Sequence, residues 1–212
     1  MRTIHKNAEP PTLAQHRCAP HANYDNLTAV SKDDLRRSLA SEQRGLCCYC
    51  MSRIRPTADQ MKIAHWHAQS THPAEQLDYG NLLGACLGNP GQPSRMQHCD
   101  ASQGNRDVSR NPANPAHQVE SLIHYLSDGR IQSDNRCFNS ELNDVLNLNA
   151  AFLTGNRKAV LDGFAKSIRN GPLQRSTLER WIRNWNGDND AGELRPYCQV
   201  VVYWHRKRLD RL

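Results

Sequence analysis

The chain has 212 residues, which is enough for one sizeable domain or for a small module surrounded by helices. Lys and Arg outnumber Asp and Glu by 27 to 21, and the resulting net charge of +6 is compatible with contacts to phosphate groups. No stretch of about 18 apolar residues could form a transmembrane helix, and residues 1–11 lack the apolar segment of a signal peptide, so we expect a cytoplasmic protein without membrane contacts.

The first half of the chain is predicted to lead from an arm through one helix into a cysteine-rich module. Residues 1–26 are rich in Pro, Asn and His and predict an extended arm or loop, and the N-terminal arm is expected to span residues 1–30. A helix is predicted over residues 31–44, with Ser31 as its N-cap. Inside the module, residues 62–67 predict a short strand and residues 79–87 a short helix or turn.

The second half, residues 111–212, is predicted to be mainly helical and to contact a partner or nucleic acid. Asp128 and Gly129 are typical of a tight turn between two strands, so a β-hairpin is predicted around them. Apolar residues at helical spacing then predict helices over residues 140–148, 153–169 and 176–185.

Eight cysteines in a chain that we expect to be cytoplasmic indicate metal binding rather than disulfides. Cys47 and Cys50 form a CxxC pair, and Cys86 and Cys99 form a second pair separated by a loop of twelve residues. Structural Zn²⁺ sites take four such thiolates in a tetrahedron. We therefore predict a structural zinc site on these four cysteines, with Cys48 as an alternative to Cys47. The competing interpretation is that they are ordinary small buried residues.

The order of residues around these cysteines matches the HNH nuclease pattern: a CxxC knuckle, a histidine, an Asn-Leu pair, and two further cysteines, the last followed by an acidic residue. The phrases GLCCYC, MKIAHWHAQS, LDYGNLLGAC and HCD resemble the HNH proteins of Septu-type antiphage systems, the PtuB family, some members of which accompany retrons. The later phrases NPANPAHQVE, IHYLSDGRI and VLNLNAAFLTGNRKAVLD resemble the same family, so that the resemblance spans roughly residues 25–170.

The resemblance implies a role for each residue of the HNH module, which is expected to span residues 31–110. His65 is expected to be the general base, since an imidazole with an unperturbed pKa near 6.5 accepts a proton from water at cytosolic pH. Asp100 is expected to bind a catalytic Mg²⁺ or Mn²⁺, and Asn81 to tie the loop between the strands and so position the base. Expected partners are a PtuA-like ATPase of the ABC type, the nucleic acid substrate and, for retron systems, the reverse transcriptase with its RNA or DNA product.

Two positions depart from the family pattern. Ala64 stands directly before His65, where the family has an acidic metal ligand, and Gln103 stands where a lysine is common. An alanine cannot bind a metal, so we expect this chain to bind its catalytic cation weakly or not at all. Three explanations are open: an engineered replacement, a natural divergence in which His67 supplies the missing ligand, or conversion to a non-catalytic binding module.

The C-terminal end is basic and contains Arg206, Lys207 and Arg208, which we predict to contact the phosphates of nucleic acid. The alternatives are an ordinary solvated face and a docking surface for the partner. The chain contains no GxxxxGK[ST] motif, so control by nucleotide would have to come from a separate subunit such as the ABC-type ATPase.

The sequence as a whole predicts an α+β fold, mainly helical, with an embedded zinc-stapled ββα-metal (HNH) module. The leading functional hypothesis is a nuclease subunit of a prokaryotic antiphage defence complex, which hydrolyses phosphodiester bonds of DNA or of RNA such as tRNA. The competing hypotheses are a non-catalytic zinc-stapled module that binds nucleic acid or protein, and a zinc-ribbon regulator in which His65 has no role.

Overall fold

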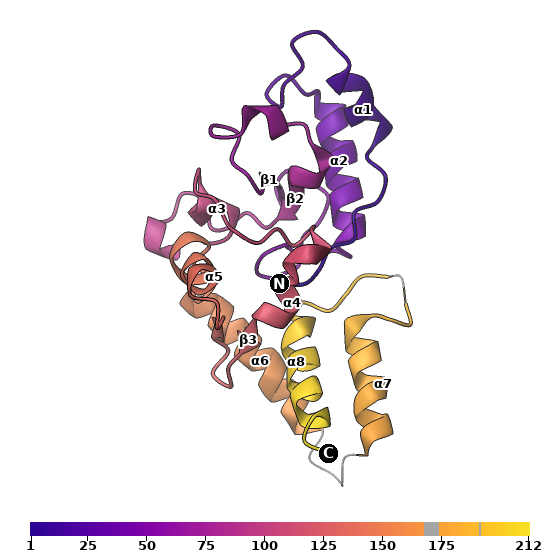
Figure 1. The fold of residues 1–212 in the computed structure, drawn as a ribbon, viewed down its shortest axis with the longest axis vertical. Coiled ribbons are helices and arrows are strands. Elements are labelled where there is room, and N and C mark those ends of the chain that lie inside the picture. The colour runs from indigo at the N-terminus through magenta and orange to yellow at the C-terminus, as the bar shows by residue number, and fades with distance from the viewer. Residues whose placement is uncertain (168–173, 191) are drawn as a thin grey trace.

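The computed structural model describes residues 1–167, 174–190 and 192–212. The chain is α+β and mainly helical, as predicted, with two separate two-stranded antiparallel sheets in the described ranges. Figure 1 shows an elongated molecule with the first two helices and the first sheet at one end and the last three helices at the other. Its helices are α1 (Pro11–Arg17), α2 (Ala29–Glu42), α3 (Asp100–Gln103), α4 (Val119–Leu122), α5 (Arg136–Ser140), α6 (Ala151–Ser167), α7 (Arg175–Asn186) and α8 (Cys198–Leu209). None of the described helices is long and apolar enough to cross a membrane.

The first sheet is a hairpin with a long connection between its strands. Strand β1 (Lys62–His65) pairs antiparallel with β2 (Leu82–Ala85), and its last residue lies opposite the first residue of β2. Helix α2 packs against both strands. Strand β2 is buried along its whole length, so the hairpin forms part of the core and gives the residues at its ends fixed positions.

The sequence prediction was wrong for β2, because residues 79–87 were expected to form a short helix or turn. Only Tyr79–Asn81 forms a 3-10 turn, and the next four residues form the strand. A short run of apolar and small residues that is buried on both faces shows no alternation, so periodicity cannot distinguish a strand from a helix there. The predicted strand at 62–67 is confirmed, although it ends at His65.

The N-terminal arm is packed onto the molecule and is partly helical, whereas an extended arm was expected. Met1, Ile4 and Leu13 are buried in the main core. Helix α1 starts at Pro11, a position where the fixed φ of proline favours a helix start. The helix predicted at 31–44 is confirmed as α2.

The expected N-cap of α2 was wrong. The helix starts earlier, at Ala29, and Thr28 is its N-cap. The Thr28 hydroxyl oxygen accepts a hydrogen bond of 3.1 Å from the backbone N–H of Ser31, so Ser31 lies inside the first turn. Both residues are good capping types, and only the backbone conformation selects between them.

The second sheet confirms the predicted hairpin, in which β3 (His124–Tyr125) pairs with β4 (Ile131–Gln132). Gly129 in its turn has φ +88°, and a side chain there would meet the backbone oxygen of Thr154. The helix predicted at 140–148 is displaced, since α5 is followed by a π turn over Glu141–Val145.

The helices predicted at 153–169 and 176–185 correspond to α6 and α7, and positions 168 and 169 lie outside the described residues. Helix α8 packs against α6 and α7. One cluster of buried apolar side chains runs from the first sheet to α8, so the two halves share a core.

Candidate functional site

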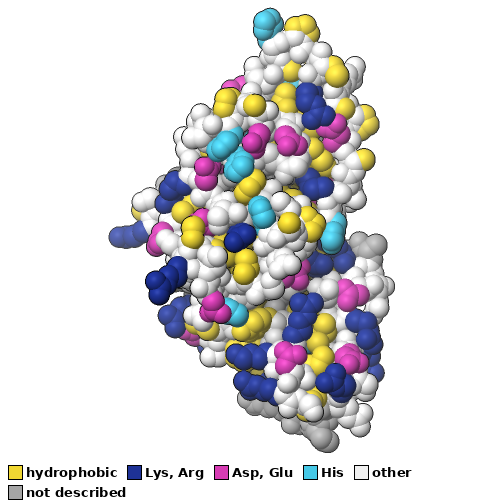
Figure 2. Space-filling view, in the orientation of Figure 1, with side chains coloured by type: hydrophobic (Ala, Val, Ile, Leu, Met, Phe, Trp, Pro, Cys, Tyr) yellow, Lys and Arg dark blue, Asp and Glu magenta, His cyan; other side chains and the backbone are white. Residues whose placement is uncertain are grey.

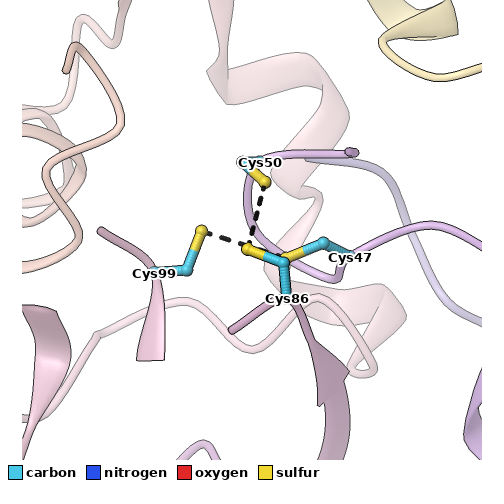
Figure 3. A group of neighbouring side chains, drawn as sticks. All are labelled: Cys47, Cys50, Cys86 and Cys99. Atoms are coloured by element: carbon cyan, nitrogen blue, oxygen red, sulfur yellow. Dashed lines mark hydrogen bonds between the residues drawn. The ribbon is translucent and has the colours of Figure 1, made fainter. Parts of the chain in front are cut away.

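Four cysteines from three parts of the fold point toward one another, as Figure 3 shows. Cys47 and Cys50 lie on a tight turn, which is closed by a 3.1 Å hydrogen bond from the N–H of Met51 to the carbonyl oxygen of Cys47. Cys86 directly follows β2, and Cys99 directly precedes α3. This cysteine quartet therefore ties the turn, the hairpin and the short helix together.

The geometry of the cysteine quartet fits a structural zinc ion. All four sulfur atoms lie within 4.8 Å of one another, with 3.9 Å between the sulfurs of Cys47 and Cys99 and 3.7 Å between those of Cys50 and Cys86. Four sulfurs at about 2.3 Å from a tetrahedral Zn²⁺ would be about 3.8 Å apart. Within the described ranges, this is the only group of three or more His, Cys, Asp or Glu side chains that could hold a metal.

Geometry separates Cys47 from Cys48, because the sulfur of Cys47 belongs to the quartet and that of Cys48 does not. Burial alone would raise the pKa of Cys47, but hydrogen bonds from the neighbouring thiols outweigh burial and lower that pKa well below its usual value. Burial raises the pKa of Cys48 well above its usual value, and this thiol lies outside the quartet. The position of the Cys47 sulfur within the quartet therefore assigns the ligand role to Cys47.

His98 adds a layer around the quartet that the sequence did not predict. Its Nδ1 lies 3.2 Å from the sulfur of Cys99 and 3.8 Å from that of Cys86, and the residue is buried. An imidazole N–H that donates to a ligand sulfur orients that sulfur and offsets part of its negative charge. A polar residue next to a ligand cysteine is the only sequence signal for this role.

His65 is the last residue of β1, and its ring is held on two sides. Its Nε2 lies 3.0 Å from the carbonyl oxygen of Gln76, and its ring meets the edge of Tyr24 with 4.6 Å between centroids. A carbonyl oxygen can only accept a hydrogen bond, so Nε2 carries the proton and Nδ1 carries the lone pair. Burial lowers the pKa of His65, which keeps the ring neutral at cytosolic pH and able to accept a proton.

Asn81 closes the loop between the two strands by three side-chain hydrogen bonds. Its Oδ1 accepts the N–H of His67 at 2.7 Å, and its Nδ2 donates to the carbonyl oxygens of His67 and Glu75 at 3.1 and 3.2 Å. The same loop carries the carbonyl of Gln76 that binds His65. Asn81 therefore acts on His65 through the loop backbone and is a positioning residue.

Asp100 begins α3 and faces Lys62 of β1, with 3.4 Å between the ammonium nitrogen and a carboxylate oxygen. Burial raises the pKa of Asp100, while the positive charge of Lys62 and its hydrogen bond to the carboxylate oppose that rise. The second expected ligand position is Ala64, a residue that is 1% exposed. A Mg²⁺ or Mn²⁺ ion would have to displace the ammonium of Lys62 from Asp100, and Ala64 supplies no second carboxylate, so these residues fit such an ion poorly.

His67 does not join Asp100 as a substitute ligand among the described residues. Its Nδ1 lies 2.7 Å from a carboxylate oxygen of Glu75, and its ring is stacked between Trp66 and His72, with 3.7 and 4.3 Å between centroids. The ring is thus engaged in the loop that follows β1. The structure gives no support to the explanation in which His67 replaces the missing acid.

Gln103, the second departure from the family pattern, is a buried connector between α3, the cysteine turn and the end of β1. Its Oε1 accepts a hydrogen bond of 2.9 Å from the hydroxyl of Tyr49. Its Nε2 donates to the carbonyl oxygens of Trp66 and Arg106. A lysine could donate to those oxygens but could not accept the Tyr49 proton, so this position has a structural role.

The three basic residues predicted to bind nucleic acid, Arg206, Lys207 and Arg208, are exposed in the last turns of α8. Figure 1 places that end of α8 at the opposite end of the molecule from β1 and β2. Arg206 lies 3.8 Å from Glu120, and Lys207 lies over the rings of Tyr203 and Trp204. The structure therefore does not bring them to His65.

No protein-family model and no curated protein matches this chain. The resemblance to the HNH proteins thus rests on the quoted residues, and the geometry of the site is the independent observation that bears on its chemistry.

Proposed function

We propose that this protein is an HNH-type nuclease subunit that hydrolyses phosphodiester bonds of nucleic acid. The observation that carries the proposal is the position of His65 at the end of a β-hairpin that the cysteine quartet joins to a following helix. The order strand, strand, helix is that of a ββα-metal module, and the quartet would hold a structural Zn²⁺. With Nε2 held by the carbonyl oxygen of Gln76, Nδ1 is the ring nitrogen of His65 that would accept the proton.

The reaction needs one proton acceptor and one positive charge near the phosphate. His65 would take one proton from water at Nδ1 while the water oxygen forms a bond to phosphorus. The bond from phosphorus to the leaving ester oxygen then breaks, and that oxygen takes a proton from solvent. The fixed hydrogen bond at Nε2 would stabilise the imidazolium that forms, because the carbonyl of Gln76 faces it.

The biological setting is proposed from the resemblance alone. It implies an antiphage defence complex in which an ABC-type ATPase controls the nuclease, with a retron reverse transcriptase as a further partner in some systems. DNA and RNA share the phosphodiester that His65 would act on. A cleavage assay on both therefore decides the substrate class.

A second candidate function is a non-catalytic module that binds nucleic acid or protein. It is favoured by the lack of suitable ligands at the place where the catalytic cation was expected. Ala64 provides no ligand, and Asp100 is paired with Lys62. Replacing Ala64 by Glu and assaying cleavage with Mn²⁺ addresses this candidate. A strong gain of activity supports a nuclease that has lost a ligand, whereas no cleavage by either protein supports the binding module.

The direct test compares His65→Ala with the wild-type chain on supercoiled DNA, single-stranded DNA and tRNA, with the zinc-loaded protein and its ATPase partner where one is encoded beside it. We expect His65→Ala to reduce cleavage by about 10²–10⁴-fold, the usual contribution of a general base. His5→Ala is the control, since His5 is exposed and lies in the N-terminal arm, outside the module. Equal cleavage by His65→Ala and wild type would contradict the nuclease proposal.

A further inference from the structure

Among the described residues, Lys62 is the one cationic side chain that forms an ion pair with the carboxylate of Asp100. It lies on β1 two residues before Ala64, and residues two apart on a strand share a face. Position 64 contributes only a methyl group to that face. The four-carbon side chain of Lys62 can therefore reach the place where the resemblance leads us to expect a metal ion.

The ion pair of Lys62 and Asp100 is exposed enough for the ammonium to contact a substrate. The Lys62 side chain is 38% exposed and the Asp100 side chain 25% exposed, so the ammonium is held at the surface of the site and is open to solvent. A pair with 3.4 Å between its atoms is a loose ion pair, and a phosphate oxygen could replace the carboxylate as the partner of the ammonium. His65 lies within electrostatic reach of the same carboxylate.

We propose that Lys62 is the cation of this site, with its ammonium in the place beside Asp100 that a divalent metal would otherwise take. This inference rests on the proposed nuclease function and names how that site would supply positive charge. The ammonium of Lys62 binds a non-bridging oxygen of the phosphate and stabilises the charge that develops as water attacks. Asp100 holds the ammonium before the substrate arrives.

The ammonium of Lys62 disfavours the binding of a divalent cation at Asp100. A Mn²⁺ ion at Asp100 would sit beside the ammonium of Lys62, and like charges repel. Ala64 supplies no second carboxylate to outweigh that repulsion. Cleavage is therefore expected in buffer without Mg²⁺ or Mn²⁺, and added Mn²⁺ is expected to leave the rate unchanged.

The test uses the full zinc-loaded chain in buffer treated to remove divalent cations, with zinc content measured before and after. Lys62→Met keeps the length of the side chain without its charge and is expected to lower kcat by about 10²-fold, with a smaller effect on KM. Lys62→Arg keeps the charge and should retain most of the rate. Lys158→Met is the matched control, because Lys158 is an exposed residue of α6 paired with Asp162.

A second readout does not depend on cleavage. Binding of Mn²⁺ alone, followed by electron paramagnetic resonance, is expected to be absent in the wild type and in Asp100→Asn, and to be gained in Lys62→Met. Wild-type binding of Mn²⁺ that Asp100→Asn abolishes would overturn the inference, as would cleavage that requires Mn²⁺ and is unchanged in Lys62→Met. If no variant cleaves in any buffer, the nuclease proposal fails, and the Mn²⁺ measurement still decides which cation belongs at Asp100.

Discussion

The hydroxyl of Tyr49 donates a 2.9 Å hydrogen bond to Oε1 of Gln103, and both side chains are buried. This contact joins the cysteine turn to α3, which begins at Asp100. Replacing Gln103 by Leu should lower the free energy of unfolding by about 1–3 kcal/mol, because the Tyr49 hydroxyl and the carbonyl oxygens that Gln103 binds would be left without a partner. Urea unfolding of the zinc-loaded protein measures the decrease.

The control for this prediction is a double-mutant cycle with Tyr49→Phe. The Tyr49→Phe change should cost less, since it removes the buried donor and leaves only the Gln103 oxygen unpaired. A coupling energy near zero would mean that the hydrogen bond contributes nothing and that Gln103 matters through packing alone.

The cysteine quartet is the part of the site that the sequence predicted best. Four cysteines of suitable spacing predict a site that could hold a zinc ion, because the ion imposes its own geometry on loops that bring the thiolates together. The choice between Cys47 and Cys48 depends on which way each side chain points from one turn. That direction is a property of the backbone, and no residue pattern reports it.

Other features of the structure also depend on the folded backbone and could not be predicted from a residue pattern. Strand β2 has no alternating pattern because both of its faces are buried. The role proposed for Lys62 rests on an ion pair with Asp100, a residue far along the chain, and only the pairing of β1 with β2 and the placement of α3 bring the two together. The turn at Gly129 was predictable, since a local conformation with positive φ selects its own residue type.

Removal of one quartet thiol should release the metal. We expect the wild-type chain to be purified with about one zinc per chain, and Cys86→Ala to contain far less and to unfold at a lower temperature, because three thiolates leave the tetrahedron open. Cys48→Ala is the matched control, since Cys48 is buried on the same turn but lies outside the quartet. Equal zinc content in the two variants would contradict the assignment of Cys86.

Asn81 should control His65 through the loop that both contact. In Asn81→Ala the N–H of His67 and two loop carbonyls lose their side-chain partner, so the carbonyl of Gln76 that holds Nε2 of His65 loses its fixed place. The change should lower kcat by more than it raises KM and should broaden or shift the imidazole signals of His65 in NMR spectra. Asn114→Ala is a suitable control, because Asn114 is an exposed residue that caps a separate 3-10 turn. Unchanged His65 signals in Asn81→Ala would rule out the positioning role.

The basic end of α8 should contribute to nucleic acid affinity without affecting the chemical step. Figure 2 shows Lys and Arg side chains gathered over the C-terminal helices on the face in view. Replacing Arg206, Lys207 and Arg208 together by Gln should weaken binding to duplex DNA. The slope of log K against log salt should become shallower by about 0.9 for each phosphate that these side chains no longer neutralise.

The control for this surface removes the same charge elsewhere. Replacing Lys32, Arg36 and Arg37 of α2 by Gln changes the net charge equally at the other end of the molecule. An identical salt dependence in the two triple variants would show that overall charge, and not the end of α8, sets the affinity. Measurements at several salt concentrations by fluorescence anisotropy separate the two cases.

His205 should make the packing of α6, α7 and α8 sensitive to acid. It is fully buried against Phe164 and Trp181, and neither of its ring nitrogens has a hydrogen-bond partner among the described residues. Burial, with a smaller contribution from the positive charge of Arg208, lowers the pKa of His205 from 6.5 to about 4. Between those two values the unfolded chain binds a proton that the folded chain does not, so acid favours unfolding. The stability that depends on a neutral His205 is therefore complete above pH 6.5 and is lost progressively as the pH falls toward 4.

The experiment compares the melting temperatures of the wild type and His205→Phe from about pH 7.5 to about pH 4.5, a range that spans most of this titration. A phenyl ring keeps the aromatic packing and cannot titrate, and it removes two buried nitrogens that lack partners, so the variant should be at least as stable as the wild type at neutral pH. Its advantage should grow by several degrees on acidification, because about 1 kcal/mol changes Tm by about 2–4 °C in a chain of this size. Parallel pH curves for the two proteins would show that His205 does not titrate on unfolding, and the acid sensitivity of the helices would then have to come from other groups.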